Sequence, residues 1–303
     1  MSERAQDQTI LCVGRLYCDL IFTGVPRFPK MGTEVFADGF GLHAGGGAFI
    51  TAAHLSRLGN RVALGAFLPT VPFQDVVHGE LVKAGLETAF CQTAAPGADP
   101  QLTVAITDSS DRAFLTRRSG AAYPEISVAE LRRFSVKHIH IGELATLVER
   151  PNIVGVARAA GASVSLDCGW DDGLAANDIG SIIGDIDLFL PNESEARHLK
   201  SIGVPEPMTA LTVVKQGAKG ATAYDGNGQV SAPASRVDVV DTTGAGDAFN
   251  AGFISAWLDQ CSLPECLRAG NAQGALAISQ LGGFQCADAL EDEQLAAVSS
   301  PQS

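Results

Sequence analysis

The chain has 303 residues and a formal net charge of −13 at pH 7, with 46% hydrophobic and 18% charged residues. These values describe a globular protein with one large α/β domain or two ordinary ones, and they exclude disorder, collagen-like repeats and a coiled coil. So acidic a surface argues against nucleic acid as a partner, because phosphate contacts require a basic footprint. A small phosphorylated ligand is not excluded, since it needs only a local binding loop.

The 7 cysteines form no C-x-x-C pair and have no histidine at zinc spacing, which indicates reduced thiols rather than a disulfide framework or a zinc site. The N-terminal residues lack the apolar core of a signal peptide, and no run of about 18 apolar residues occurs. We therefore expect a cytoplasmic protein that does not contact a membrane.

Short β-branched runs alternate with helical patterns along most of the chain, which predicts a mainly parallel, doubly wound sheet. The expected strands cover residues 10–14, 19–23, 62–65, 137–141, 164–166, 187–190 and 211–214. The expected helices cover 45–58, 75–84, 127–134, 151–160, 174–183, 193–201, 245–259 and 262–280. Two hairpins are expected, at 102–107 with 112–116 and at 222–224 with 229–231. Ligands of such sheets bind beyond the carboxyl ends of the strands, so the strand-to-helix junctions are where functional residues are expected.

The junction from Val239 to Phe253 has the strongest chemical signal, because an apolar strand leads through a glycine-rich turn into an amphipathic helix. Gly244 and Gly246 allow consecutive backbone N–H groups to converge at the helix N-terminus, where the helix dipole favours negative charge. Asp247 falls in the first helical turn, where its carboxylate could accept a proton from a hydroxyl that attacks a phosphoryl group. On these local grounds Asp247 could equally be a residue that caps the helix and complements its charge.

Residues 241–253, Asp-Thr-Thr-Gly-Ala-Gly-Asp-Ala-Phe-Asn-Ala-Gly-Phe, resemble the C-terminal signature of the PfkB carbohydrate kinases, the ribokinase-like family. The resemblance covers nearly the whole chain and includes Gly14 with Asp19 and the segments 26–32, 45–59, 191–196 and 214–220. It implies a single ribokinase-like domain over 1–303. The implied fold is a doubly wound, mainly parallel α/β sheet flanked by helices, with a small β lid formed by segments about 16–42 and 100–120.

The resemblance further implies an ATP-dependent kinase that transfers the γ-phosphoryl group to a hydroxyl of a sugar or nucleoside-like substrate. Asp247 would be the general base, and the N–H groups of Gly244, Ala245 and Gly246 would steady the transferring group. The nucleotide-binding positions would be Asn192, Lys215, Gly217, Gly220 and Asn271. Mg²⁺ would be organised, through water, by Asn192 and Glu195. A monovalent cation such as K⁺ would lie beside Asp241 and Thr243, near the loop around Gly282.

Alternatives stay open for three of these assignments. Glu195 could be an exposed helix acid, since Glu193 lies beside it. Asn271 could be an amide that packs its helix against a neighbour. The monovalent cation site depends on carbonyl geometry that a sequence does not display.

The substrate residues are expected on the lid and at the first helix. Asp19 is the best sugar ligand, because one carboxylate can accept from two adjacent hydroxyls. Gly45 and Gly46 would bring backbone against the sugar face, and closure of the lid would exclude water. Tyr17 and Ile50 stand where many relatives carry asparagine, whose paired hydrogen bonds neither side chain can make. The substrate is therefore expected to present a different hydroxyl pattern or to carry an apolar or aromatic group.

Further polar residues follow other predicted strands. Glu143 comes after strand 137–141 and is a candidate substrate contact. Asp167 ends strand 164–166, where it could contact a ligand or position a loop. One of Arg112, Arg117 and Arg118 could clamp a phosphate already on the substrate, or all three could form a solvated hairpin face.

The alternative function is a regulatory protein that binds a sugar or nucleotide without turnover. The intact Gly244–Asp247 element favours the kinase, whereas Tyr17 and Ile50 keep the alternative open. A dinucleotide-binding dehydrogenase is disfavoured, because Gly14 is followed by Arg-Leu-Tyr rather than by a G-x-G-x-x-G turn. The expected partner is a small-molecule sugar or nucleoside, with no nucleic acid and no membrane, and a homodimer through the lid is a further expectation.

Overall fold

The main sheet has eight strands within the part of the chain that the structure describes, in the order β14-β13-β12-β11-β10-β9-β1-β4. The computed structural model describes residues 8–98, 100–107, 112–169, 171, 179–204, 208–240 and 242–279. The parallel strands are β1 (Thr9–Val13), β4 (Arg61–Gly65), β9 (Val136–Ile141), β10 (Ser163–Asp167), β11 (Leu188–Leu190) and β12 (Thr212–Lys215). An antiparallel hairpin, β13 (Ala221–Asp225) with β14 (Gly228–Ala232), completes one edge.

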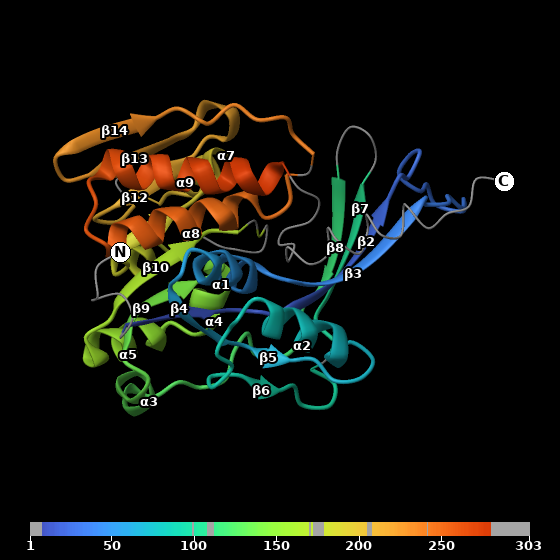
Figure 1. Cartoon of the computed structure of the whole chain (residues 1–303), viewed down its shortest axis with the longest axis horizontal. Coiled ribbons are helices and arrows are strands. Elements are labelled where there is room, and N and C mark those ends of the chain that lie inside the picture. Colours follow the sequence, from blue (N-terminus) through green and yellow to red (C-terminus); the bar gives the residue numbers. More distant parts are fainter. Residues whose placement is uncertain are drawn as a thin grey trace.

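Helices cover both faces of this sheet (Figure 1). One apolar cluster joins it to α1 (Gly47–Arg57), α2 (Gln74–Lys83), α8 (Ala245–Leu258) and α9 (Leu263–Ile278). A second joins the opposite face to α3 (Val128–Arg133), α4 (Leu144–Glu149), α5 (Asn152–Ala160), α6 (Ile179–Gly184) and α7 (Glu193–Ser201). The fold expected from the sequence, a doubly wound and mainly parallel sheet between two helical layers, is confirmed.

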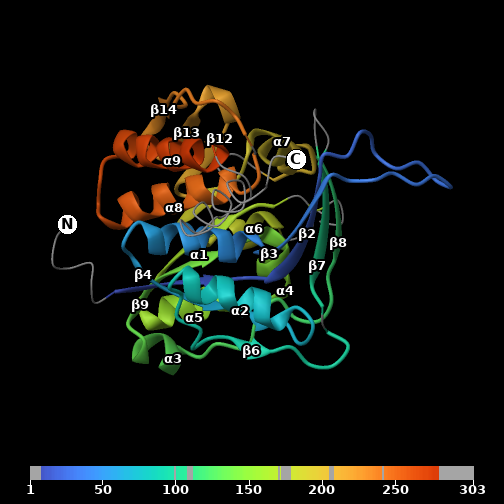
Figure 2. The same ribbon diagram turned by 45° about the vertical axis from the view of Figure 1, so that its right-hand side comes forward.

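A second, four-stranded sheet stands away from this body (Figures 1 and 2). We call it the small sheet; its order is β3-β2-β7-β8, with β2 (Tyr17–Thr23), β3 (Gly39–Gly45), β7 (Leu102–Thr107) and β8 (Arg112–Arg117). β2 pairs antiparallel with β3 and parallel with β7. Its strands come from the two segments expected to form the lid, and β2 follows directly on β1 of the main sheet.

Strand β3 was not predicted, and the helix expected from residue 45 begins instead at Gly47. The three glycines of β3 weaken a local strand pattern, and only the pairing of Asp19 with His43 and of Leu20 with Leu42 across β2 makes the segment a strand. The short strands β5 (Phe67–Leu68) and β6 (Gln92–Thr93) and helix α4 were also not predicted. Among the described residues, no helix combines the length and the apolar character that crossing a membrane requires.

Candidate active site

Helix α8 begins at a glycine turn beside Lys215, the last residue of β12. Gly244 is the N-cap residue, with φ of 70°, a left-handed conformation that favours glycine. Its carbonyl accepts the first helical bond from Ala248 N–H at 2.8 Å. The N–H groups of the first turn have no partner within the helix, so this end of α8 suits an anion.

Asp247 lies in that first turn and faces the N-terminus of α1. A Cβ added to Gly47 would lie 3.0 Å from Asp247 Oδ1, and the Thr51 hydroxyl lies 3.5 Å from the same oxygen. Burial and the neighbouring Asp167 carboxylate raise the pKa of Asp247 well above that of an ordinary aspartate. Because Gly244 occupies the N-cap, Asp247 does not cap α8 with its side chain. Its carboxylate is placed and electrostatically suited to take up a proton.

Lys215, at the end of β12, carries a positive charge beside this helix end. A Cβ added to Gly246 would lie 3.4 Å from Lys215 Nζ. The ammonium donates to Asp167 Oδ1 at 2.9 Å and to Asn250 Oδ1 at 3.1 Å, and Asn250 Nδ2 donates to Asp167 Oδ2 at 2.7 Å. Burial alone would lower the pKa of Lys215, but the carboxylates of Asp167 and Glu195 outweigh burial and raise it. Lys215 is therefore charged and held in place.

The sequence alone leaves the role of Asp167 undecided and does not single out Asn250. Asp167, at a strand end where it could contact a ligand or position a loop, orients Lys215 and also accepts from the backbone N–H of Cys168 at 2.8 Å. Asn250 stands one helical turn after Asp247, on the same face of α8. Only that spacing within the glycine-rich motif could have indicated it.

Asn192 and Glu195 form a reciprocal cap at the start of α7. Asn192 Oδ1 accepts from the N–H groups of Ser194 and Glu195 at 2.9 Å each, and Glu195 Oε2 accepts from Asn192 N–H at 2.7 Å. Glu195 is only 8% exposed, so the alternative of an exposed helix acid is wrong. Burial and the nearby carboxylate of Asp167 raise the pKa of Glu195.

The turn after β12 contains Gly217 and Gly220, which are expected at the nucleotide, and both have the positive φ that favours glycine. Gly217 and Gly220 have φ of 56° and 97°, and a Cβ added to Gly217 would meet nothing within 4 Å. Asn271 on α9 is buried, and its amide donates to the carbonyl oxygens of Ala232 and Pro233 at 3.1 and 3.0 Å. These bonds are the ones expected of an amide that packs α9 against a neighbouring segment. A contact of Asn271 with an adenine stays a prediction.

Asp19 of β2 lies against the backbone of Gly45. A Cβ on Gly45 would overlap the Asp19 carboxylate, so a larger residue there would displace that carboxylate. Burial raises the pKa of Asp19 to about 6. His43 of β3 lies directly across from Asp19. Its Nδ1 is 3.0 Å from Oε1 of Glu80 on α2. No sequence pattern indicates this contact, because Glu80 lies on α2, a separate helix of the body.

Tyr17 and Ile50 line the same region from β2 and α1. Tyr17 is 8% exposed, and a Cβ added to Gly46 would lie 3.1 Å from its ring. Gly46 itself has φ of 101°, which excludes most other residues. Ile50 is 7% exposed and belongs to the apolar cluster beneath α1. Neither side chain offers an amide at this position.

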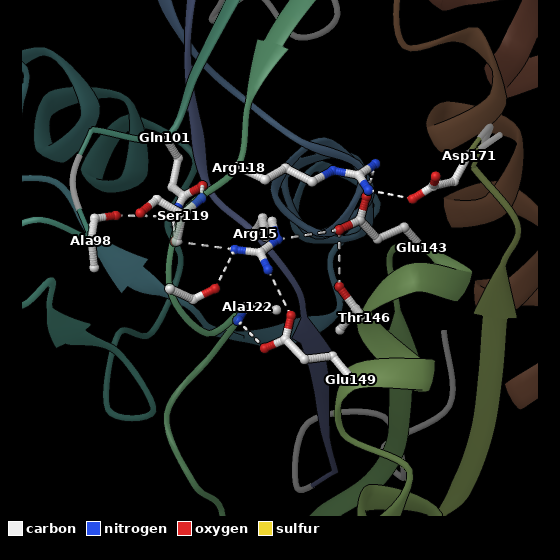
Figure 3. A network of polar contacts seen from close by, with 11 residues as sticks. Arg15, Ala98, Gln101, Arg118, Ser119, Ala122, Glu143, Thr146, Glu149 and Asp171 are labelled. Atoms are coloured by element: carbon white, nitrogen blue, oxygen red, sulfur yellow. Dashed lines mark hydrogen bonds and ion pairs between the residues drawn. The ribbon is translucent and has the colours of Figure 1, made fainter. Parts of the chain in front are cut away.

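Arg118 follows β8 and reaches the body (Figure 3). Its guanidinium pairs with Glu143 at 3.5 Å and with Asp171 at 2.5 Å, and it hydrogen-bonds the phenol of Tyr17. Arg117 donates to the Pro100 carbonyl, and nothing is described of the side chain of Arg112. The guanidinium of Arg118 therefore pairs with the body although the residue is exposed, and its role toward a substrate phosphate stays a prediction.

Two of the residues expected at a monovalent cation site have no described geometry. Asp241 and the loop around Gly282 lie outside the described residues, whereas Thr243 lies in the turn before α8. The described residues contain no group of three or more His, Cys, Asp or Glu side chains placed to hold a metal ion. Mg²⁺ commonly binds through one or two carboxylates together with phosphates and water, and the donor set of Glu195, Asn192 and Asp167 fits that mode.

Comparison with known proteins gives matches along nearly the whole chain. A family model described as pfkB family carbohydrate kinase matches residues 7–290. A ribokinase of Haemophilus influenzae is 24% identical over 294 residues, which are 91% of this chain and 94% of the relative. An ATP-dependent ribose-1-phosphate kinase of Halopiger xanaduensis is 28% identical over 284 residues, 90% of this chain and 93% of that one. A nucleoside kinase structure from Methanocaldococcus jannaschii superposes with a TM-score of 0.78 at 20% identity, covering 96% of this chain and 99% of that one, and shows the same fold.

Proposed function

This chain belongs to the pfkB family of carbohydrate kinases and is a phosphotransferase with an alcohol group as acceptor, and we propose that it transfers the γ-phosphoryl group of ATP to a hydroxyl of a sugar or nucleoside-like molecule. The family resemblance seen in the sequence is thereby confirmed. The observation that carries the proposal is the place of Asp247. Its carboxylate, with a raised pKa, stands at the N-terminus of α8 beside the Lys215 ammonium.

Asp247 is the general base of the proposed reaction. It accepts the proton of the acceptor hydroxyl as that oxygen attacks the phosphoryl group, and its raised pKa makes this uptake more favourable than for an exposed aspartate. The first-turn N–H groups of α8, from Gly244 to Gly246, donate to the transferring group, and Lys215 adds a fixed positive charge there. Asp167 and Asn250 keep the ammonium oriented.

The nucleotide site lies between the turn at Gly217–Gly220 and the start of α7. When bound, ATP supplies the phosphoryl group and Mg²⁺ neutralises part of its charge. Glu195 and Asn192 would orient the waters of the metal, and Thr243 would contribute to a monovalent cation site, whose other expected residue, Asp241, lies outside the described residues. The reciprocal cap of Asn192 and Glu195 supports this role, because it fixes the Glu195 carboxylate before any ligand arrives.

The small sheet acts as a lid over the acceptor. Asp19 accepts from acceptor hydroxyls, Gly45 and Gly46 bring their backbone close, and Tyr17, Ile50 and Glu143 shape the pocket. β1 of the main sheet leads directly into β2 of the small sheet, and His43 bonds Glu80 of the body. These two links support a lid that is attached to the body at one end and free to move at the other. Closure removes water that would otherwise compete for the phosphoryl group.

The small sheet also carries apolar side chains that support a homodimer through the lid. Phe40 on β3 is 60% exposed and Leu115 on β8 is 74% exposed. Exposed apolar groups on a sheet of this size favour association with a second copy. Sedimentation of the wild type and of Phe40→Ser with Leu115→Ser tests this, and a monomeric wild type at micromolar concentration contradicts it.

The proposed function is tested by a screen for acceptor-dependent ADP formation with sugars, nucleosides and sugar phosphates. Each active acceptor is then identified as its phosphomonoester by phosphorus NMR. We expect at least one acceptor to raise ADP formation far above the background hydrolysis of ATP. Tight binding of a sugar or nucleotide without any product would instead support the regulatory protein.

A further inference from the structure

Arg118 is held by three groups, of which Figure 3 shows the carboxylates of Asp171 and Glu143. Its Nη1 lies 2.5 Å from Asp171 Oδ2, its Nη2 lies 3.5 Å from Glu143 Oε2, and it also bonds the phenol of Tyr17. Both terminal nitrogens of the guanidinium therefore already face carboxylates. These neighbours raise the pKa of Arg118 further, although burial opposes them, so the side chain stays charged.

A second arginine completes the cluster and fixes the chain after β8. Arg15 Nη2 pairs with Glu149 at 2.6 Å, and its Nε lies 3.9 Å from Glu143. Arg15 also donates to the carbonyl oxygen of Gly120 at 2.9 Å, while Glu149 accepts from Ala122 N–H at 2.8 Å. The chain directly after Arg118 is thereby anchored to the body.

We call Arg15, Arg118, Glu143, Glu149 and Asp171 the arginine–carboxylate cluster. Two guanidinium groups face three carboxylates, so the cluster has one net negative charge. Sites that bind phosphate instead present an excess of positive charge or unpaired N–H donors. Although it contains two arginines, the cluster therefore lacks the excess of positive charge that is typical of a phosphate site.

The cluster borders the proposed acceptor site directly. A Cβ on Gly47 would lie 2.7 Å from the carbonyl oxygen of Gly142, the residue before Glu143, and 3.0 Å from Asp247 Oδ1. The ring of Tyr17, which bonds Arg118, lies against Gly46. An acceptor whose hydroxyl meets Asp247 therefore extends toward Tyr17 and the cluster.

Resting on the proposed kinase function, we infer that Asp171 and Glu143 make this pocket selective for acceptors that carry no phosphate. A phosphate brings a charge of about −1.5 to −2 at pH 7, which the net charge of the cluster repels. If it took the guanidinium of Arg118, Asp171 and Glu143 would lose their partner in a partly buried place. Asp171 is the specificity-determining residue, because it binds Arg118 most closely and has no part in the proposed chemistry. Family membership alone does not decide whether the acceptor carries a phosphate, since one relative is named a ribose-1-phosphate kinase.

The test compares acceptors that differ by one phosphate placed on a hydroxyl other than the acceptor: ribose with ribose 1-phosphate or ribose 5-phosphate, fructose with fructose 1-phosphate or fructose 6-phosphate, and inosine with its 3′- or 5′-monophosphate. Phosphorus NMR of the product identifies the acceptor hydroxyl, and the phosphate ester that leaves this hydroxyl free is the one used. kcat/KM is measured for each pair with the wild type, Asp171→Asn and Arg118→Gln. Glu87→Gln is the control. Glu87 pairs with Arg61 at 2.8 Å on the exposed start of β4, so the same charge is removed outside the cluster.

We expect the wild type to favour the unphosphorylated member of its best pair by about a hundredfold or more. Asp171→Asn removes one carboxylate partner of Arg118 and should narrow that ratio by about tenfold. The change should come from a lower KM for the phosphorylated member, while kcat for the unphosphorylated member stays nearly unchanged. Arg118→Gln should widen the ratio, and Glu87→Gln should leave it unchanged.

Equal or better use of the phosphorylated members by the wild type, or an unchanged ratio in Asp171→Asn, overturns the inference. The same pairs are titrated by calorimetry with ADP present. Absence of turnover then counts against the proposed function, while the ratio of the dissociation constants still decides the charge preference.

Discussion

Nδ1 of His43 lies 3.0 Å from Oε1 of Glu80, so a strand of the small sheet is tied to a helix of the body. Glu80 Oε2 also accepts the backbone N–H of Ala44 at 2.7 Å. Because His43 is the direct cross-strand neighbour of Asp19, this bond fixes the surroundings of the carboxylate proposed to hold the acceptor. Glu80 acts through His43 and is a positioning residue.

The first prediction concerns the pH dependence of acceptor binding. Burial raises the pKa of Asp19 to about 6, while the Thr103 hydroxyl and His43 lower it and Glu80 raises it. Below that pKa the carboxyl is protonated and accepts fewer hydroxyl bonds, so KM for the acceptor should rise as the pH falls through 6, approaching tenfold per pH unit. Steady-state kinetics from pH 5 to 8 measure this. Asp19→Asn should have a raised KM without that pH dependence; the same dependence in Asp19→Asn would assign it to another group.

The second prediction concerns Lys215. Lys215→Gln removes the charge beside the N-terminus of α8, and we expect kcat to fall by about a hundredfold, because a fixed charge at the transferring group is lost. Lys219→Gln is the matched control on the same turn, since Lys219 is exposed and pairs only at 3.6 Å with Glu193. Similar rates for both variants would remove Lys215 from the proposed transfer step.

The third prediction concerns the metal. Glu195→Gln keeps an oxygen that can accept the Asn192 N–H but removes the charge proposed to orient metal-bound water. The Mg²⁺ concentration needed for half-maximal activity should rise about tenfold or more. Glu193→Gln, at the partly exposed neighbouring position, should leave the Mg²⁺ titration unchanged. If both titrations match the wild type, the role of Glu195 is the cap of α7 alone.

The fourth prediction concerns acceptor choice. Tyr17 and Ile50 provide no amide, so ribose should be a poor acceptor, and a sugar or nucleoside with a ring or alkyl substituent should be better. kcat/KM is compared for ribose, fructose and nucleosides in the wild type and in Tyr17→Asn with Ile50→Asn. Because Ile50 is buried, Tyr17→Asn is also measured alone, and Tyr17→Phe serves as the variant that keeps the ring. Efficient use of ribose by the wild type, with no gain in the variants, would show that these two positions do not set the choice.

The sequence predicted the parallel strands, most helices and the glycine-rich start of α8, because each is encoded in a short stretch of chain. Strand β3 escaped prediction because its pairing with β2, rather than its own glycine-rich sequence, makes it a strand. The contacts of Arg118 with Glu143 and Asp171 join residues far apart in the chain, so no local pattern indicates them. The same holds for Lys215, whose partner Asp167 lies 48 positions away.

The measurement that tests the central claim most directly is the turnover of Asp247→Asn on the best acceptor of the screen. We expect kcat to fall by about two to four orders of magnitude while ATP binding and the unfolding temperature stay close to those of the wild type, because only the proton acceptor is removed. An Asp247 that merely complements the charge of α8 would instead lose about 1 kcal/mol of stability or less and keep its rate. Near-normal turnover by Asp247→Asn would contradict the assignment of Asp247 as the base.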